Sequence, residues 1–276
     1  MSSKFHAKSA EAYDQLMGRW SRRLAKPFLD FAGLDAGERV LDVGCGTGSL
    51  TFTIPQVAEI ARIDGIDFSD TYAEAARARN TDPRITIARG DVCALPFEDR
   101  TFDRTLALLV LHFVPESEQA LREMSRVTKP GGVVAAAVWD SYGGMPYQRM
   151  FWDTAAALDP SAAAHRRESY YKPLTGSGEM RALWTKAGLA DVAEVPLMIR
   201  MDYLGFEDFW TPYAEGEGPL GKYVTGLDAA MRSALERALR AAYEAGEPDG
   251  PRSFAAVAWA CRGVVPEGWH QREEPP

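Results

Sequence analysis

The stretch from 38 to 50 constrains the fold of this chain more than any other. After Glu38 and Arg39 it reads Val-Leu-Asp-Val, a short and mostly apolar run of the kind that forms a buried strand. Glycines follow at alternate positions, Gly44, Gly46 and Gly48, where side chains would keep a ligand away from the backbone. We expect a helix to begin within 47–50, so that unpaired N–H groups face a cleft. This order of strand, glycines and helix predicts an α/β fold that binds a nucleotide-like cofactor.

The glycine spacing argues against a dinucleotide. Dinucleotide-binding proteins usually carry G-x-G-x-x-G, with the helix end facing a pyrophosphate. Here Asp42 precedes alternate glycines, and its carboxylate suits a ligand that carries an ammonium and a sulfonium, such as S-adenosylmethionine (SAM). The stretch resembles motif I of the class I, Rossmann-like SAM-dependent methyltransferases. An NAD(P)-dependent oxidoreductase and a catalytically silent SAM-binding protein are the alternatives.

Length and charge narrow the class of substrate. A chain of 276 residues is long for one minimal domain and short for two, so we expect one core with inserted segments. The formal net charge of -8 argues against a nucleic-acid partner, because a surface that binds phosphates needs clustered basic residues. A small-molecule methyl acceptor is therefore favoured.

Cysteine and histidine spacing predicts neither a disulfide nor a metal site. The three cysteines form no C-x-x-C pair, and the four histidines show no metal-ligand spacing. Cys45, inside the glycine stretch, is expected to be a small apolar filler. Neither 1–13 nor the apolar run 106–114 has the character of a signal peptide or membrane span, so we expect a cytoplasmic protein with no membrane partner.

The family resemblance implies a Rossmann-like, doubly wound sheet of seven mostly parallel strands, the last antiparallel, with helical cap insertions. We expect one domain over 1–276. Its expected parts are lid helices at 1–34, the SAM-binding core at 35–139, substrate-side insertions at 140–191 and 203–250, and final strands at 192–202 and 253–262.

Residues 9–32 predict two amphipathic helices ahead of the glycine stretch. Ser21 can cap the second helix, and Gly33 can end it. The family resemblance implies that such helices close over the cofactor as a lid.

Guanidinium groups gather around one indole in this segment. Arg19 and Arg22 flank Trp20, and an arginine can clamp a carboxylate with two parallel hydrogen bonds. Either arginine could hold the methionine carboxylate of SAM, with Tyr13 or Trp20 closing over it. A solvated basic helix face is the alternative.

A second expected strand, 62–67, ends in an acidic residue whose sequence separation from Gly44 indicates a role in cofactor binding. Asp67 follows Gly44 by 23 positions (67 minus 44), near the spacing of about 20 at which a carboxylate meets the ribose hydroxyls. Ser69 is the expected cap of a helix over 70–79. Asp67 is therefore interpreted as a ribose ligand rather than a capping residue.

A third strand, 84–88, leads to a second acidic position. The resemblance implies that Asp91 accepts a hydrogen bond from the adenine amino group and that the N–H of Val92 donates to a ring nitrogen. It also implies that Phe68 packs on the adenine.

A fourth strand, 102–109, is followed by a helix over 116–128, a Lys-Pro-Gly-Gly turn and a fifth strand, 133–139. In family terms the carbonyl of Leu108 receives the ammonium of SAM. The residues assigned to the cofactor are Tyr13, Arg22, Asp42, Gly44, Cys45, Gly46, Gly48, Asp67, Phe68, Asp91, Val92 and Leu108.

Methyl transfer is an in-line displacement that depends mainly on positioning, and a base matters only when the acceptor must lose a proton. His112, just past the fourth strand, is the candidate for a base or a positioning group. Most tryptophans lie at or beyond 139, which favours a flat or apolar acceptor. The candidate acceptor contacts are Trp20, Trp139, Trp152, Trp210 and Tyr213. The acceptor, the atom methylated and the oligomeric state, for which a homodimer stays open, are not decided by the sequence.

Overall fold

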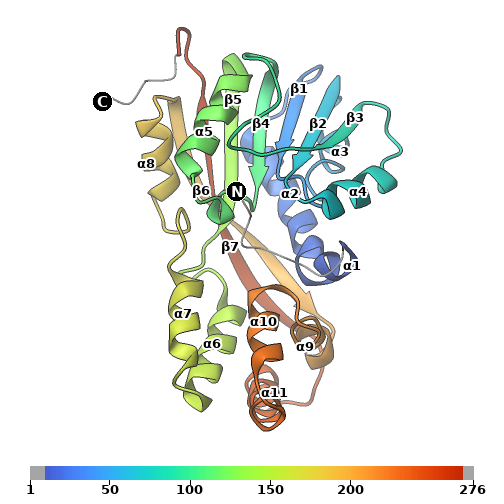
Figure 1. Ribbon diagram of the computed structural model, residues 1–276, viewed down its shortest axis with the longest axis vertical. Coiled ribbons are helices and arrows are strands. Elements are labelled where there is room, and N and C mark those ends of the chain that lie inside the picture. The colour runs from blue at the N-terminus through green and yellow to red at the C-terminus, as the bar shows by residue number, and fades with distance from the viewer. Residues whose placement is uncertain (1–9, 270–276) are drawn as a thin grey trace.

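A computed structural model describes residues 10–269, and its centre is one seven-stranded sheet (Figure 1). The strand order is β3-β2-β1-β4-β5-β7-β6, and β7 alone runs against its neighbours. The doubly wound, mostly parallel sheet with an antiparallel last strand is thus confirmed. The strands are β1 Arg39–Val43, β2 Arg62–Asp67, β3 Ile85–Arg89, β4 Phe102–Leu108, β5 Thr128–Trp139, β6 Ala190–Tyr203 and β7 Arg252–Val264.

Helices cover the sheet and form a lobe beyond the carboxyl ends of the parallel strands, low in the view of Figure 1. The lobe consists of α6, α7, α9, α10 and α11, whereas α8 packs on β6. The expected helical insertions are therefore present. The helices are α1 Ala10–Tyr13, η1 Asp14–Gly18, α2 Arg19–Ala32, α3 Ile54–Val57, α4 Asp70–Arg79, η2 Leu111–Phe113, α5 Ser117–Val127, α6 Pro146–Leu158, α7 Ala162–Tyr170, α8 Glu179–Lys186, α9 Phe206–Ala214, α10 Gly218–Gly226 and α11 Ala229–Glu244.

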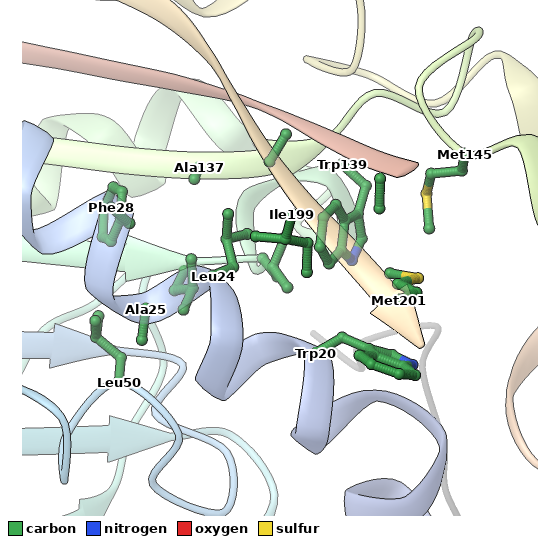
Figure 2. Packing of buried hydrophobic residues seen from close by; sticks show 14 of the residues in the cluster. Trp20, Leu24, Ala25, Phe28, Leu50, Ala137, Trp139, Met145, Ile199 and Met201 are labelled. Atoms are coloured by element: carbon green, nitrogen blue, oxygen red, sulfur yellow. The ribbon is translucent and has the colours of Figure 1, made fainter. Parts of the chain in front are cut away.

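The sheet and α2 share the larger of two apolar cores. In Figure 2, Leu24 and Phe28 of α2 lie against Ala137 of β5, and Trp20 lies near Met201 at the end of β6. Because α2 is anchored here over its whole length, the segment before it has a fixed starting point above the sheet.

The glycine turn, 44–48, is sterically defined. Gly44 has a φ of +70°, and a Cβ there would lie 2.4 Å from a methyl carbon of Val110, so only glycine fits. Below the turn, the almost completely buried Asp42 accepts a hydrogen bond of 2.5 Å from the Thr51 hydroxyl. This bond joins β1 to the segment that follows the glycine turn.

The prediction that a helix begins within 47–50 is wrong. The chain continues in turns, and the helix α3 is only the four residues Ile54–Val57. Pro55 explains the difference, because proline fits the first turn of a helix but clashes with the preceding turn in a helix interior. The glycine turn is thus followed by further turns and one short helix, and the N–H groups of Cys45, Gly46 and Gly48 donate within the protein.

Two other local expectations need correction. Ser21 lies inside α2 and donates to the Met17 carbonyl at 3.2 Å, so it is not a cap; a π-helical turn joins α1 and α2 into one continuous helix. The fifth strand begins at Thr128, before the Lys-Pro-Gly-Gly segment, because Thr128 already pairs with Phe102 across an irregular register. Gly33 does end α2, with a φ of +69°.

None of the helices within 10–269 has the length and apolar character needed to cross a membrane.

Asp42→Asn should gain stability relative to the natural protein as pH rises. Burial raises the pKa of the Asp42 carboxyl to about 7, whereas the unfolded chain releases this proton near 3.8. Its contribution to stability is therefore complete below the unfolded pKa and is lost as pH rises through 7. Asparagine has no proton to lose, so the free energy of unfolding should shift in favour of the variant by up to about 1.4 kcal/mol per pH unit in this window.

Urea unfolding between about pH 5 and pH 8 measures this difference. Asp82→Asn is the control, because hydrogen bonds from Arg84 hold the pKa of Asp82 at about 2, below the window. A difference between Asp42→Asn and the natural protein that does not change with pH would contradict a protonated, buried carboxyl.

Candidate active site

A cavity of about 360 Å³ opens at the carboxyl ends of β1, β2 and β4. Open α/β sheets bind ligands at this edge, where the strand order reverses beside β1. The predicted site residues that line it are Tyr13, Gly44, Gly46, Asp67, Phe68, Asp91, Val92, Leu108, His112 and Trp139.

Asp67 is fixed by backbone donors on two elements. One carboxylate oxygen accepts from the Gly46 N–H at 2.9 Å and the other from the Ser69 N–H at 2.8 Å. Burial nevertheless raises the pKa of Asp67, and the two hydrogen bonds oppose that shift. Because each oxygen has a second lone pair, the carboxylate can accept two further hydrogen bonds from a ligand.

The next wall of the cavity carries Phe68 and Asp91. Phe68 is 38% exposed, and the Arg89 guanidinium lies 5.7 Å from its ring centroid. Asp91 accepts a hydrogen bond from the Cys93 N–H at 2.9 Å and lines the cavity. A flat, polar-edged ligand could stack on the first side chain and donate to the second.

Beyond β4 the chain turns sharply toward the glycine turn. Leu108 is the last residue of the strand, and Leu109 adopts a φ of +63°, which costs energy for a side chain of this size. The Leu109 N–H donates to the Ala137 carbonyl at 2.8 Å, which holds the turn in place. Val110 is thereby brought over Gly44.

His112 is a buried, uncharged group on the cavity wall. Burial, and secondarily the charge of Lys172, lower the pKa of His112 to about 3. Among residues 10–269 its Nδ1 atom finds no hydrogen-bond partner, and neither does Nε1 of Trp139, which lines the same cavity; both atoms are buried. The imidazole is therefore neutral at physiological pH and has unused hydrogen-bonding capacity.

The N-terminal helical segment is tied to the glycine turn through Asp14. This carboxylate accepts from the Thr47 hydroxyl at 2.6 Å and from Arg79 of α4 at 2.5 Å. A Cβ at Gly18 would lie 2.4 Å from the same carboxylate, so glycine is needed where the segment passes it. The Asp14 junction, formed with Thr47 and Arg79, holds Tyr13 and Met17 at the cavity wall.

The structure corrects the expected placement of several cofactor residues. Asp42 lies beneath the glycine turn and not on the cavity wall. Arg22 is half exposed and lies 3.6 Å from Asp14, so it supports the Asp14 junction. Cys45 packs 3.3 Å from the position of a side chain at Gly65, and burial raises the pKa of its thiol, as a structural filler requires. Gly48 faces the Phe52 ring instead of the cavity.

The expected acceptor contacts are also mostly elsewhere. Trp152, Trp210 and Tyr213 are buried in the aromatic core of the lobe, where Trp210 stacks on Phe206. Trp20 packs against Tyr203, with Arg19 lying 4.3 Å from its ring, while Arg19 pairs with Asp208. Of the five aromatic candidates, Trp139 alone is part of the cavity wall.

Sequence reasoning missed other wall residues, such as Met17, Tyr72, Val110 and Phe113. Tyr72 could have been found, since it follows the helix cap Ser69 by three residues and so stands at the cavity end of α4. Its ring lies 5.1 Å from that of Tyr13, which links the N-terminal segment to α4. Within 10–269 no group of His, Cys, Asp and Glu is arranged to hold a metal ion.

Comparison with known proteins finds a matching domain family and similar proteins. Residues 41–136 match the methyltransferase domain family. A demethylmenaquinone methyltransferase of Staphylococcus aureus is 37% identical over 117 residues, which are 42% of this chain and 47% of the relative, so the chain spans less than half the length of that relative.

Solved structures share the fold over most of the chain. The YcgJ protein of Bacillus subtilis is 19% identical with a TM-score of 0.59, covering 89% of this chain and 99% of its own. Phosphoethanolamine N-methyltransferase 2 of Haemonchus contortus, solved with S-adenosyl-L-methionine, is 17% identical with a TM-score of 0.58. The match covers 93% of this chain and 56% of the Haemonchus chain. In its matched segment, and in the fold that it shares with these structures, the chain is similar to class I, Rossmann-like methyltransferases.

Proposed function

We propose that this protein transfers a methyl group from SAM to a small-molecule acceptor. The observation that carries the proposal is the cavity itself, which joins a turn of alternate glycines to two carboxylates, Asp67 and Asp91, inside a methyltransferase domain. An acidic wall suits a cationic donor and opposes a diphosphate. The NAD(P)-dependent alternative is disfavoured on this ground.

The residues present fit SAM. A Cβ at Gly46 would have no atom nearer than the Tyr13 hydroxyl at 3.9 Å, so the backbone of the turn is open there to a ligand in the cavity. Asp67 keeps lone pairs for two hydroxyls, and the Asp91 carboxylate lies on the same cavity wall, where an amino group could donate to it.

Roles follow from these positions. Asp67 would bind the ribose hydroxyls, Phe68 would stack on the adenine, and Asp91 with the Val92 N–H would recognise the adenine edge. The carbonyl of Leu108 would receive the methionine ammonium, and Tyr13, held by the Asp14 junction, would close over the bound cofactor.

When bound, SAM supplies a methyl group activated by a sulfonium. The protein's part is to hold the acceptor in line and to exclude water, and such positioning can lower a barrier by on the order of 7 to 11 kcal/mol. His112 is too weakly basic for efficient proton removal near neutral pH, since its pKa is about 3. It acts instead as a neutral hydrogen-bonding group that positions the acceptor.

The net charge and the free cysteines agree with a small-molecule substrate. The net charge is -8, and Cys45, Cys93 and Cys261 are free thiols. We therefore place the activity in the cytoplasm, without a nucleic-acid or membrane partner. A homodimer would leave the cavity unchanged, since the cavity is lined within one chain.

Purified protein should bind SAM and S-adenosylhomocysteine but not NAD, and Asp67→Ala should weaken SAM binding by about tenfold or more, because hydrogen bonds to a charged group are lost. Isothermal titration measures each affinity. Asp70→Ala, which removes an exposed carboxylate outside the cavity wall, is the control. Tight NAD binding without SAM binding would overturn the proposed function.

Asp14→Asn should weaken SAM binding by several-fold and leave the overall fold intact. The amide is isosteric but loses the charge that holds Arg79, so the N-terminal segment should open more often. Hydrogen exchange of residues 10–18, with and without S-adenosylhomocysteine, measures the opening. Equal exchange and equal affinity in the two proteins would show that the junction does not hold the segment.

His112→Gln should lower the rate of methyl transfer while its dependence on pH stays flat from about pH 6 to pH 8, because a pKa of about 3 leaves His112 neutral throughout. The rate is measured as S-adenosylhomocysteine formed from SAM when a panel of phenols, amines and acids is offered as acceptors.

If the rate of the natural protein instead changes with pH around a pKa near 6.5, and this change is absent in the variant, His112 acts as a base. Silence of the natural protein across the panel would favour a binding protein without catalysis.

A further inference from the structure

Lys172 is a cation that the proposed chemistry does not use, and the structure holds it in a fixed place. It follows α7 by two residues, and its carbonyl accepts from the Thr175 hydroxyl at 2.8 Å. Leu174, buried and with a φ of +65°, anchors the same loop in the apolar core under α8. The side chain of Lys172 therefore projects from a tethered backbone.

Its ammonium reaches the cavity wall. The Lys172 nitrogen lies 5.4 Å from the ring centroid of Phe113, and Phe113 and His112 both line the cavity. The ammonium is also close enough to His112 to lower the pKa of the imidazole. Lys172 is not itself a wall residue, and the wall past β4 also carries Glu116, whose carbonyl accepts from the Cys93 thiol at 3.7 Å next to Asp91.

The Phe113 ring is the one partner of this charge that the described residues provide. Burial lowers the pKa of Lys172, and no acidic side chain among residues 10–269 forms an ion pair with it. A partly buried charge without an anionic partner is costly, and an anion that enters the site would remove that cost. By contrast, Lys129 pairs with Asp103 at 2.6 Å and Lys186 with Glu118 at 2.7 Å.

Two exposed tyrosines adjoin this position. Tyr171, which precedes Lys172, makes an edge contact with Tyr142 at 5.4 Å between ring centroids, and the two are 65% and 58% exposed. Tyr142 lies three residues beyond Trp139, a wall residue. Aromatic surface beside a single ammonium suits a ring that carries one negative charge.

We propose that Lys172 binds a carboxylate of an aromatic methyl acceptor at the outer wall of the cavity. One ammonium matches a singly charged carboxylate better than a phosphate, which carries more charge and usually takes several donors. His112 and Trp139, which both line the cavity, then lie beside the rest of the acceptor. This inference rests on the proposed function, because it assigns the acceptor end of the same cavity.

The test compares acids with their esters. Protein saturated with S-adenosylhomocysteine is titrated with 4-hydroxybenzoate, 4-hydroxycinnamate and their methyl esters, followed by tryptophan fluorescence and calorimetry. The natural protein should bind at least one acid more tightly than its ester. Lys172→Met should lower the affinity for that acid by about tenfold and leave the ester unchanged, since a charge-assisted hydrogen bond is lost.

Lys172→Gln repeats the measurement with a polar side chain in case Lys172→Met folds poorly, and Lys186→Met is the matched control. Four results would overturn the inference: no binding of any acid, no preference for the acids in the natural protein, a preference that survives both Lys172 variants, or an equal loss in Lys186→Met. The titration with SAM is separate, so failure of the proposed function appears there, whereas failure of this inference appears only in the comparison of acids with esters.

Discussion

The site depends on the pair of hydrogen bonds that the Asp67 carboxylate accepts from the backbone. Through them the end of β2 is joined to the glycine turn after β1 and to the start of α4. A buried carboxylate would otherwise be unfavourable, and the raised pKa of Asp67 shows that burial still outweighs the two donors. The turn, the strand end and the helix start therefore keep their relative positions whether or not a ligand adds further donors.

The Asp14 junction extends this arrangement to the N-terminal segment. Thr47 belongs to the glycine turn and Arg79 to the end of α4, so one carboxylate of the lid contacts both elements that Asp67 holds together. The bonds are partly exposed, and exposed ion pairs contribute little stability each. In the proposed role of a lid, these contacts would order Tyr13 over the cavity and would still be weak enough to open for exchange of ligands.

Local chemistry was predictable from the sequence, and long-range placement was not. The Ser69 cap, the end of α2 at Gly33 and the acidic end of β2 depend on neighbouring residues, and the structure has all three. Arg22 and Trp210 carry no local sign of their environment: the first pairs with a carboxylate on its own helical segment, and the second fills the core of the lobe. Their types suit a binding site and an interior equally well.

The position of His112 just past the fourth strand pointed to the cavity, but no local sign showed that Phe113 and Lys172 lie beside it. Lys172 is distant in the chain, and its ammonium reaches this wall only because α7 and the loop after it fold back over the end of β4. Carboxylates at the ends of β2 and β3 favour positive charge, and Glu116 adds a further carboxyl group past β4. The Lys172 ammonium beside Phe113 is the cation that we propose for a ligand with negative charge. A donor at the strand ends and an acceptor beside Phe113 would then be positioned for a displacement between them.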